Sequence, residues 1–169
     1  MAKVLVVMGS DSDLEVMKQA VDALTACGVD SEVHISSAHR TPDKTANLSR
    51  EAEARGFSAI IAGAGMAAHL PGVIAAFTNL PVIGVPLAGS ALGGTDALYA
   101  IVQMPKGVPV ATVAVNGAYN AGLLAAQIVA SHDADVRQQF ARVREQMAER
   151  AAQKDAKLQA DGIEGYTHD

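Results

Sequence analysis

The sequence predicts an α/β fold in three layers, with a doubly wound parallel sheet between two layers of helices. Three observations lead to this prediction. Val4 to Met8 form a continuous apolar run, which is typical of a strand covered on both faces. Strand-like and helix-like segments alternate five times along 169 residues, a length that suits a single domain over residues 1–169. Half of the residues are hydrophobic and only 4% are aromatic, so small aliphatic side chains must build the core.

Start and stop signals place the individual elements. Ser12, with Glu15 three residues later, has the pattern of a capping box, and Gly28 suits the end of the helix that follows. Thr41 and Pro42 predict the N-cap and first position of a second helix. The predicted strands are residues 3–8, 31–36, 57–62, 82–85 and 108–115. The predicted helices are residues 13–27, 42–55, 72–77, 95–103 and 118–131, followed by a helical arm over about residues 133–160.

Five alternating units imply a flavodoxin-like sheet with strand order 2-1-3-4-5 and a switch point between strands one and three. That order brings together the turns after the first three strands, at residues 9–13, 36–41 and 63–69. Ligands bind at this edge of a parallel sheet, where the helix after each turn offers free N–H groups to an anion. We therefore expect the functional site there.

The last two predicted helices indicate an oligomer. Residues 118–131 are apolar on nearly every face, so we expect cover from beyond their own sheet, most simply from another subunit. The charged arm that follows carries one narrow apolar stripe, made of Val136, Phe140, Val143 and Met147. This stripe fits a long C-terminal helix used in oligomer contacts, although it would also fit a peripheral helix on the domain.

Charge and cysteine content exclude several classes of partner. A formal net charge of -5 argues against a nucleic-acid partner, because such a partner needs a broad basic face. The single cysteine, Cys27, excludes an internal disulfide and a multi-cysteine metal site. No leader pattern and no apolar run of about 18 residues are present, so we expect a cytoplasmic protein without a membrane partner.

Five polar residues on the three turns have the inventory for acid–base chemistry on a phosphorylated small molecule. Arginine and a helix N-terminus suit a phosphate, serine and aspartate suit ribose or amine groups, and imidazole gains and loses protons near neutral pH. The residues are Ser10, Asp13, His39, Arg40 and His69. The other histidines, His34, His132 and His168, are expected to be structural or solvated.

The third turn, Gly63 to His69, also matches a G-x-G-x-x-A dinucleotide fingerprint. It follows the third strand rather than the first, and no acidic residue occurs between Glu53 and Asp96 to hold a ribose hydroxyl. We therefore reject the dinucleotide interpretation. Small residues here would let a ligand approach the backbone closely, or would serve close packing of helix on strand. No nucleophile elbow, phosphate loop or histidine pair with metal-ligand spacing is present in the sequence.

Four segments together resemble the N5-carboxyaminoimidazole ribonucleotide mutase family of purine biosynthesis. They are Met8 to Asp13, Ser37 to Pro42, Ala62 to Gly72 and Ile101 to Pro105. The resemblance covers nearly the whole chain. It implies transfer of a carboxylate from the exocyclic nitrogen to a ring carbon of the imidazole nucleotide, without ATP, metal or organic cofactor. It also implies a homo-octamer with active sites at subunit boundaries.

The resemblance carries roles over to matching positions. His39 matches the family's general acid and base, Arg40 its binding arginine, and Ser10 and Asp13 its substrate-binding serine and aspartate. His69 matches the histidine of the third loop. Ser37 and Gly65, within the matched segments, complete the expected substrate-binding set.

One residue and one short segment depart from the family's pattern. Met66 stands where the family usually has glycine, and Val115 to Tyr119 are not the commonest version of their segment.

Two other functions compete with the mutase. A related carboxylase joins free carbon dioxide to aminoimidazole ribonucleotide on the same fold, but such relatives typically carry lysine after the histidine, where this chain has Arg40. A non-catalytic nucleotide-binding module would need no positioned histidine and would bind without turnover.

Overall fold

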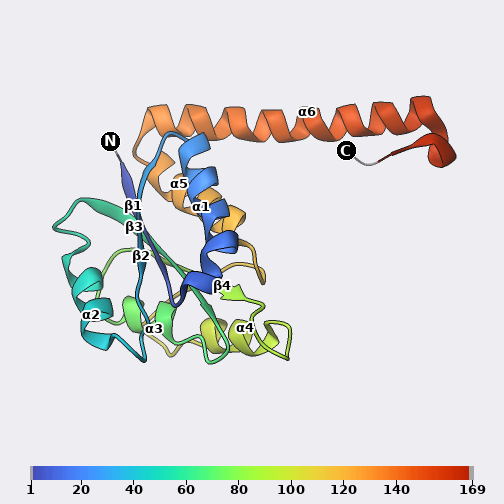
Figure 1. The fold of residues 1–169 in the computed structure, drawn as a ribbon. Coiled ribbons are helices and arrows are strands. Elements are labelled where there is room, and N and C mark those ends of the chain that lie inside the picture. The colour runs from blue at the N-terminus through green and yellow to red at the C-terminus, as the bar shows by residue number, and fades with distance from the viewer. Residues whose placement is uncertain (1, 168–169) are drawn as a thin grey trace.

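A computed structural model describes residues 2–167, and it has a five-stranded, all-parallel sheet with helices on both faces (Figure 1). The strand order is β2-β1-β3-β4-β5, as predicted, so the switch point lies between β1 and β3. The strands are β1 (Lys3–Met8), β2 (Asp30–Ile35), β3 (Phe57–Gly65), β4 (Val82–Leu87) and β5 (Ala111–Thr112). The helices are η1 (Asp11–Asp13), α1 (Leu14–Ala26), α2 (Pro42–Glu51), α3 (Leu70–Ala75), α4 (Thr95–Val102), α5 (Ala118–Ala130) and α6 (Ala134–Gly165).

Alternate residues of the strands divide the core between the two faces of the sheet. Val4, Val6 and Ile61 point toward α1 and α5, whereas Leu5 and Ile60 point toward α2, α3 and α4. All five side chains are fully buried. This two-sided burial explains the continuous apolar run in β1, because neither face of a central parallel strand meets water.

Two strands differ from their predicted lengths. β3 continues to Gly65, and Gly63 within it lies against α1, where an added side chain would meet the Met17 sulfur. β5 is only two residues long rather than eight. The carbonyl of Pro86 in β4 accepts the N–H of Asn116, but proline has no N–H for the return bond, so the regular ladder ends early.

Part of the cover of α5 comes from this same chain, whereas the expected cover by another subunit stays a prediction. α5 packs against α1 and the first part of α6, and its Ala121, Ala125 and Val129 are fully buried in that core. Its larger aliphatic side chains, Leu123, Leu124 and Ile128, are only partly buried by this chain.

α6 is a long arm that leaves the domain. Val136 and Val143 are buried against the core, whereas Met147 is 46% exposed and the rest of the helix extends away from the sheet (Figure 1). The helix is interrupted by non-helical backbone at Gly162. Only the first part of the apolar stripe, from Val136 to Val143, thus packs in the core of this domain. No helix in residues 2–167 is long and apolar enough to span a membrane.

Candidate functional site

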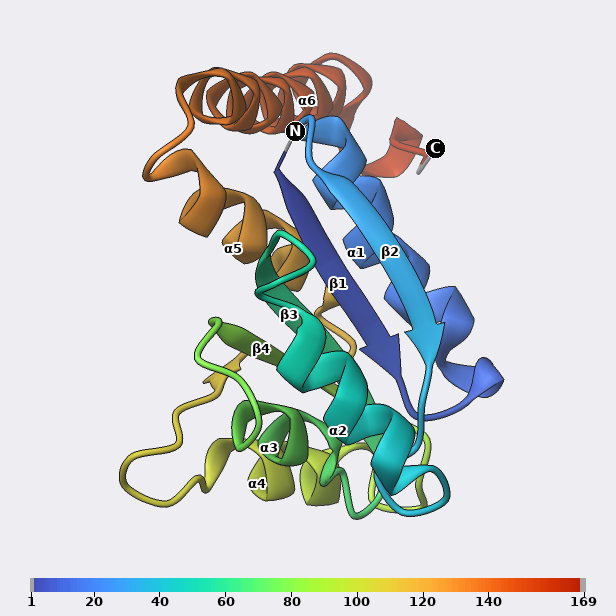
Figure 2. The same cartoon turned by 90° about the vertical axis from the view of Figure 1, so that its left-hand side faces the viewer.

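The turns after β1, β2 and β3 meet at the carboxyl edge of the sheet and enclose a pocket of about 520 Å³. Figure 2 shows β1 and β2 running side by side toward this edge, with α2 beside them. All seven candidate residues lie in its lining: Ser10, Asp13, Ser37, His39, Arg40, Gly65 and His69. The predicted meeting of the three turns is therefore confirmed, while the function of the pocket and the role of each residue stay predictions.

The first turn is fixed by a capping box between Ser10 and Asp13, not between Ser12 and Glu15 as predicted. The Ser10 N–H donates to Asp13 Oδ2 at 3.0 Å, and the Ser12 N–H donates to Ser10 Oγ at 3.4 Å. Burial raises the pKa of the Asp13 carboxyl, and the hydrogen bond from the Ser10 amide opposes this rise. Two residues expected to bind substrate are thus held in place by each other.

The second turn presents His39 and Arg40 at its apex. The Thr41 N–H donates to Ser37 O at 2.8 Å and the Arg40 N–H donates to Ser37 Oγ at 3.2 Å, so Ser37 anchors the turn. Thr41 has the N-cap position of α2, but its hydroxyl contacts the backbone of Ser37 instead of capping the helix. Arg40 Nη2 donates to Gly9 O at 3.0 Å, which ties this turn to the end of β1.

The two histidines of the pocket touch each other. His39 Nε2 and His69 Nδ1 are 2.6 Å apart, and the rings meet edge to face with centroids 4.8 Å apart. One nitrogen must donate and the other accept, so the tautomers of the two rings are linked. Because two imidazolium ions offer no acceptor, the pair holds at most one extra proton while this contact lasts. That is the property a one-proton shuttle needs.

The third turn, over residues 65–68, is strained. The Ala68 N–H donates to Gly65 O at 3.0 Å, and Met66, the first central residue, has φ 56°. Ala68 also has positive φ, at 37°. Side chains disfavour this backbone region, which is where glycine is preferred in turns. Met66 is 64% exposed at the rim of the pocket, whereas Ala68 is buried beneath it.

Some lining residues were not singled out from the sequence. Gly89 comes from the loop after β4, which reaches the pocket because β4 lies beside β3. Ala64 and Leu70 supply buried apolar surface at the end of β3 and the start of α3. In the predicted sheet order the fourth strand lies beside the third, so the loop after the fourth strand, with Gly89, could have been expected at this pocket.

The remaining histidines lie elsewhere. His34 is hydrogen bonded to Glu32 on β2, as expected for a structural residue, and His132 Nδ1 lies 3.2 Å from the Ser131 hydroxyl. His168 lies outside the described residues. Within residues 2–167, no group of three or more histidine, cysteine or acidic side chains is placed to hold a metal ion.

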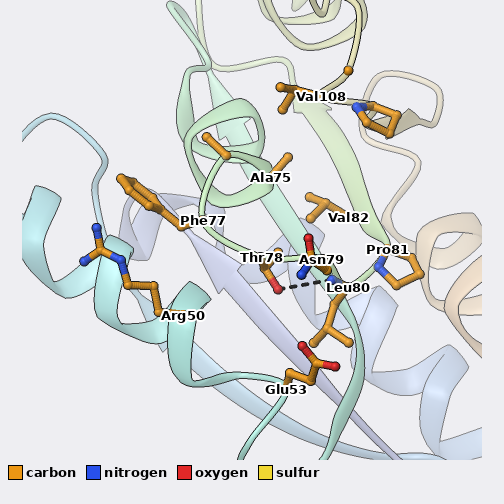
Figure 3. A pocket seen from close by; sticks show the side chains of 13 residues that line it. Arg50, Glu53, Ala75, Phe77, Thr78, Asn79, Leu80, Pro81, Val82 and Val108 are labelled. Carbon is orange, nitrogen blue, oxygen red and sulfur yellow. Dashed lines mark hydrogen bonds between the residues drawn. The ribbon is translucent and has the colours of Figure 1, made fainter.

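A larger hollow, of about 940 Å³, lies at the opposite edge of the sheet (Figure 3). Its charged lining residues are Arg50 and Glu53, and Arg50 stacks on the Phe77 ring with its guanidinium carbon 4.4 Å from the ring centre. The Thr78 hydroxyl accepts the Leu80 N–H at 3.2 Å. No histidine lines this hollow, so its size does not make it the place for proton transfer.

Known proteins resemble this chain over nearly its full length. A family model described as AIR carboxylase matches residues 3–150. N5-carboxyaminoimidazole ribonucleotide mutase of Thermotoga maritima is 51% identical over 166 residues, which are 98% of this chain and 97% of that protein. Phosphoribosylaminoimidazole carboxylase of Candida glabrata is 52% identical over 161 residues, but these are 95% of this chain and only 28% of that protein. The crystal structure of Treponema denticola PurE matches with a TM-score of 0.84 at 28% identity and covers 94% of this chain and 99% of that chain.

Proposed function

Because this chain belongs to the AIR carboxylase family, we propose that it is an N5-carboxyaminoimidazole ribonucleotide mutase. The reaction converts N5-carboxyaminoimidazole ribonucleotide, a carbamate nucleotide, into 4-carboxyaminoimidazole ribonucleotide for purine biosynthesis. The observation that carries the mechanism is the 2.6 Å contact between His39 and His69 beside Arg40 in one pocket. A binding module would not require this linked pair of imidazoles.

The binding roles follow the charges of the pocket. Arg40 keeps further N–H donors free after its bond to Gly9 O, and they suit the anionic substrate. Ser10 and Asp13 offer a hydroxyl and a carboxylate to the nucleotide's polar groups. Ser37, Gly65 and His69 complete the proposed substrate-binding set along the second and third turns.

His39 is the proposed acid and base. Protonated His39 donates its proton to the carbamate nitrogen. The bond between this nitrogen and the carboxylate carbon then breaks, its electron pair stays on nitrogen, and carbon dioxide is released. The neighbouring ring carbon then forms a C–C bond to the carbon dioxide. His39 finally removes the proton from that ring carbon and returns to its starting state. Protons and electrons balance without an added reagent, and one histidine suffices for both transfers.

The carbon dioxide must stay in the pocket between the two steps. Ala64 and Ala68 are nearly fully buried, and Leu70 is buried beside them. These apolar side chains form a small surface that offers water no hydrogen bonds and favours retention of an apolar gas molecule.

A carboxylase that uses free carbon dioxide is the second candidate. It is favoured by the 52% identity with part of the Candida glabrata carboxylase. The deciding experiment gives the purified chain either N5-carboxyaminoimidazole ribonucleotide without bicarbonate, or aminoimidazole ribonucleotide with bicarbonate, and follows formation of 4-carboxyaminoimidazole ribonucleotide. The mutase proposal requires efficient turnover of the first substrate. Efficient turnover of the second mixture alone would make the chain a carboxylase, and binding without turnover would make it a binding module.

A cytoplasmic homo-octamer is part of the same proposal. The distal half of α6 supports it, because a helix that projects from its own domain has surface available for another copy (Figure 1). Light scattering should give about eight times the chain mass of 17.4 kDa. A well-folded monomer at micromolar concentration would contradict this assembly.

A further inference from the structure

Three buried hydroxyls lie behind the turn that carries His39 and Arg40. Ser36, Thr45 and Ser49 are at most 1% exposed, and they are the buried polar side chains of residues 2–167. A buried hydroxyl is costly unless it is hydrogen bonded, so such a cluster needs a reason. Each of the three has a partner, and two of them reach the ends of the turn.

The hydroxyl of Thr45, on α2, joins the two ends of the turn. Thr45 Oγ1 lies 2.8 Å from Ser36 Oγ, at the end of β2, and 3.3 Å from Thr41 O, at the start of α2. The Ser36 N–H donates to Met8 O at 2.8 Å, so this end is also fixed to β1. His39 and Arg40 lie between the two points that Thr45 connects.

One arrangement of protons satisfies every hydroxyl at once. Ser36 donates to Thr45, Thr45 donates to Thr41 O, and Thr41 donates to Ser37 O at 3.1 Å while accepting the Ser37 N–H at 2.9 Å. The bonds of the Thr41 hydroxyl to Ser37 do not pass through Thr45, and the Ser36 hydroxyl also lies 3.4 Å from Thr41 Oγ1. Removal of the Thr45 hydroxyl breaks the link from Ser36 to Thr41 O and leaves the buried Ser36 hydroxyl with only the longer contact to Thr41 Oγ1.

We propose that Thr45 is a positioning residue: its hydroxyl sets the shape of the turn so that His39 meets His69 and Arg40 reaches Gly9. Thr45 touches neither ring and does not line the pocket, so it acts only through the turn. A displacement of about 1 Å at a reacting group can cost about 100-fold in rate, so loss of this hydroxyl is expected to be visible in turnover. This inference rests on the proposed function for its kinetic readout.

The chain offers a matched control on the same helix. The Ser49 hydroxyl is as buried as that of Thr45, but it donates only to Thr45 O at 2.7 Å and has no bond to the turn. Thr45→Val removes the hydroxyl and keeps the branched shape, Thr45→Ser restores the hydroxyl, and Ser49→Ala removes a hydroxyl that does not reach the turn. If only buried hydrogen bonding mattered, Thr45→Val and Ser49→Ala would behave alike.

The experiment measures kcat, KM and melting temperature for these variants, together with the imidazole ¹⁵N signals of His39 and His69 in the ligand-free protein. We expect Thr45→Val to lower kcat by about 10- to 100-fold and to shift both imidazole signals. Thr45→Ser should recover most of kcat, and Ser49→Ala should stay within about twofold of wild type with unchanged imidazole signals.

Wild-type kcat in a folded Thr45→Val protein, failure of Thr45→Ser to recover kcat, or an equal loss in Ser49→Ala would overturn the inference. If Thr45→Val does not fold, Ser36→Ala breaks the same link from the other side and is judged by the same readouts. If the wild type does not turn over the carbamate nucleotide, the proposed function fails separately. The imidazole signals then decide the positioning role without any turnover: shifts in Thr45→Val but not in Ser49→Ala support it, and unchanged signals overturn it.

Discussion

The two edges of the sheet are built from the same strands but carry different side chains. At the carboxyl edge, three turns bring His39, His69 and Arg40 into a pocket of about 520 Å³, and one turn there is strained. At the amino edge lies a larger hollow of about 940 Å³, where the Arg50 guanidinium is stacked on the Phe77 ring. Strand direction and side-chain chemistry, rather than the size of a hollow, therefore indicate the candidate functional site in this fold.

The amino half of the sheet also contains an ion-pair cluster around Glu32. Lys3 lies 2.9 Å from Glu32, and His34 and Arg55 contact the same carboxylate. Lys3 and Arg55 in addition lie over the ring of Phe57. These contacts join β1, β2 and the start of β3, so we assign the cluster to stability. Mutations in the carboxyl-edge pocket should therefore lower activity, whereas mutations in the Glu32 cluster should lower the melting temperature.

The largest expected effect is that of His39→Asn. The variant should fold and bind nucleotide but lose about 10²- to 10⁴-fold in kcat, because a positioned acid–base group contributes about that much. Arg50→Ala at the larger hollow should stay within about twofold of wild type. Steady-state assays of both variants measure the difference. Near-normal turnover of folded His39→Asn would remove the proposed role.

Arg40→Lys is expected to have the next largest effect. Lysine keeps the charge but loses the planar fork that donates to two anionic oxygens, so nucleotide affinity should fall by about 10- to 100-fold. Arg50→Lys is the matched substitution at the amino edge and should leave affinity unchanged. Titration calorimetry with the product nucleotide gives both values. Equal affinities of wild type and Arg40→Lys would mean that Arg40 is only a surface charge.

Glu32→Gln should change stability and not activity. Hydrogen bonds from His34, Lys3 and Arg55 lower the pKa of the Glu32 carboxyl from its ordinary 4.5 to about 2. Its stabilisation is therefore fully present above about pH 4.5 and is lost as the pH falls toward 2. After allowance for solvent screening, we expect a loss of about 1–2 kcal/mol at pH 7, or about 2–6 °C in melting temperature.

Melting curves of wild type and Glu32→Gln between pH 7 and pH 3 test the sign. The difference between the two proteins should shrink as the pH falls below 4.5. A difference that stays constant or grows on acidification would contradict the ion-pair account of this cluster.

The smallest expected effect is that of Met66→Gly. Glycine relieves the positive φ of 56° but adds freedom to the unfolded chain, so stability should change by no more than about 1 kcal/mol, in the stabilising direction. Denaturant unfolding measures this change. Destabilisation by more than about 1 kcal/mol would show that the exposed Met66 side chain makes contacts that outweigh its backbone strain.

The order of the sheet and the place of the pocket could be predicted because they depend on local patterns. Apolar strands, capped helices and the rules for parallel sheets sufficed to bring residues 9–13, 36–41 and 63–69 together. Details that depend on distant partners could not be predicted. The regular pairing of β5 ends after Thr112, next to Pro86 of β4, which has no N–H to donate.

The capping box in the pocket and the buried hydroxyls of Ser36 and Thr45 behind it show the same limit of sequence-based prediction. Both Ser10 with Asp13 and Ser12 with Glu15 fit the spacing of a capping box, and only the turn after β1 decides between them. The bond between Thr45 and Ser36 joins residues nine positions apart on a helix and a strand end, and hydrophobic periodicity does not indicate it. The apolar pattern of α5 likewise does not indicate which neighbour covers each face: α1 and α6 of the same chain cover part of the helix, and Leu123, Leu124 and Ile128 stay partly exposed.

Isotope retention tests the central claim most directly, because the carboxyl group should not leave the carboxyl-edge pocket between decarboxylation and recarboxylation. N5-carboxyaminoimidazole ribonucleotide labelled in its carboxylate is mixed with excess protein and unlabelled bicarbonate for a single turnover, and the label in the carbon-carboxylated product is counted. The account predicts a product that keeps most of the label. A product that carries the unlabelled carbon of the surrounding bicarbonate would contradict it.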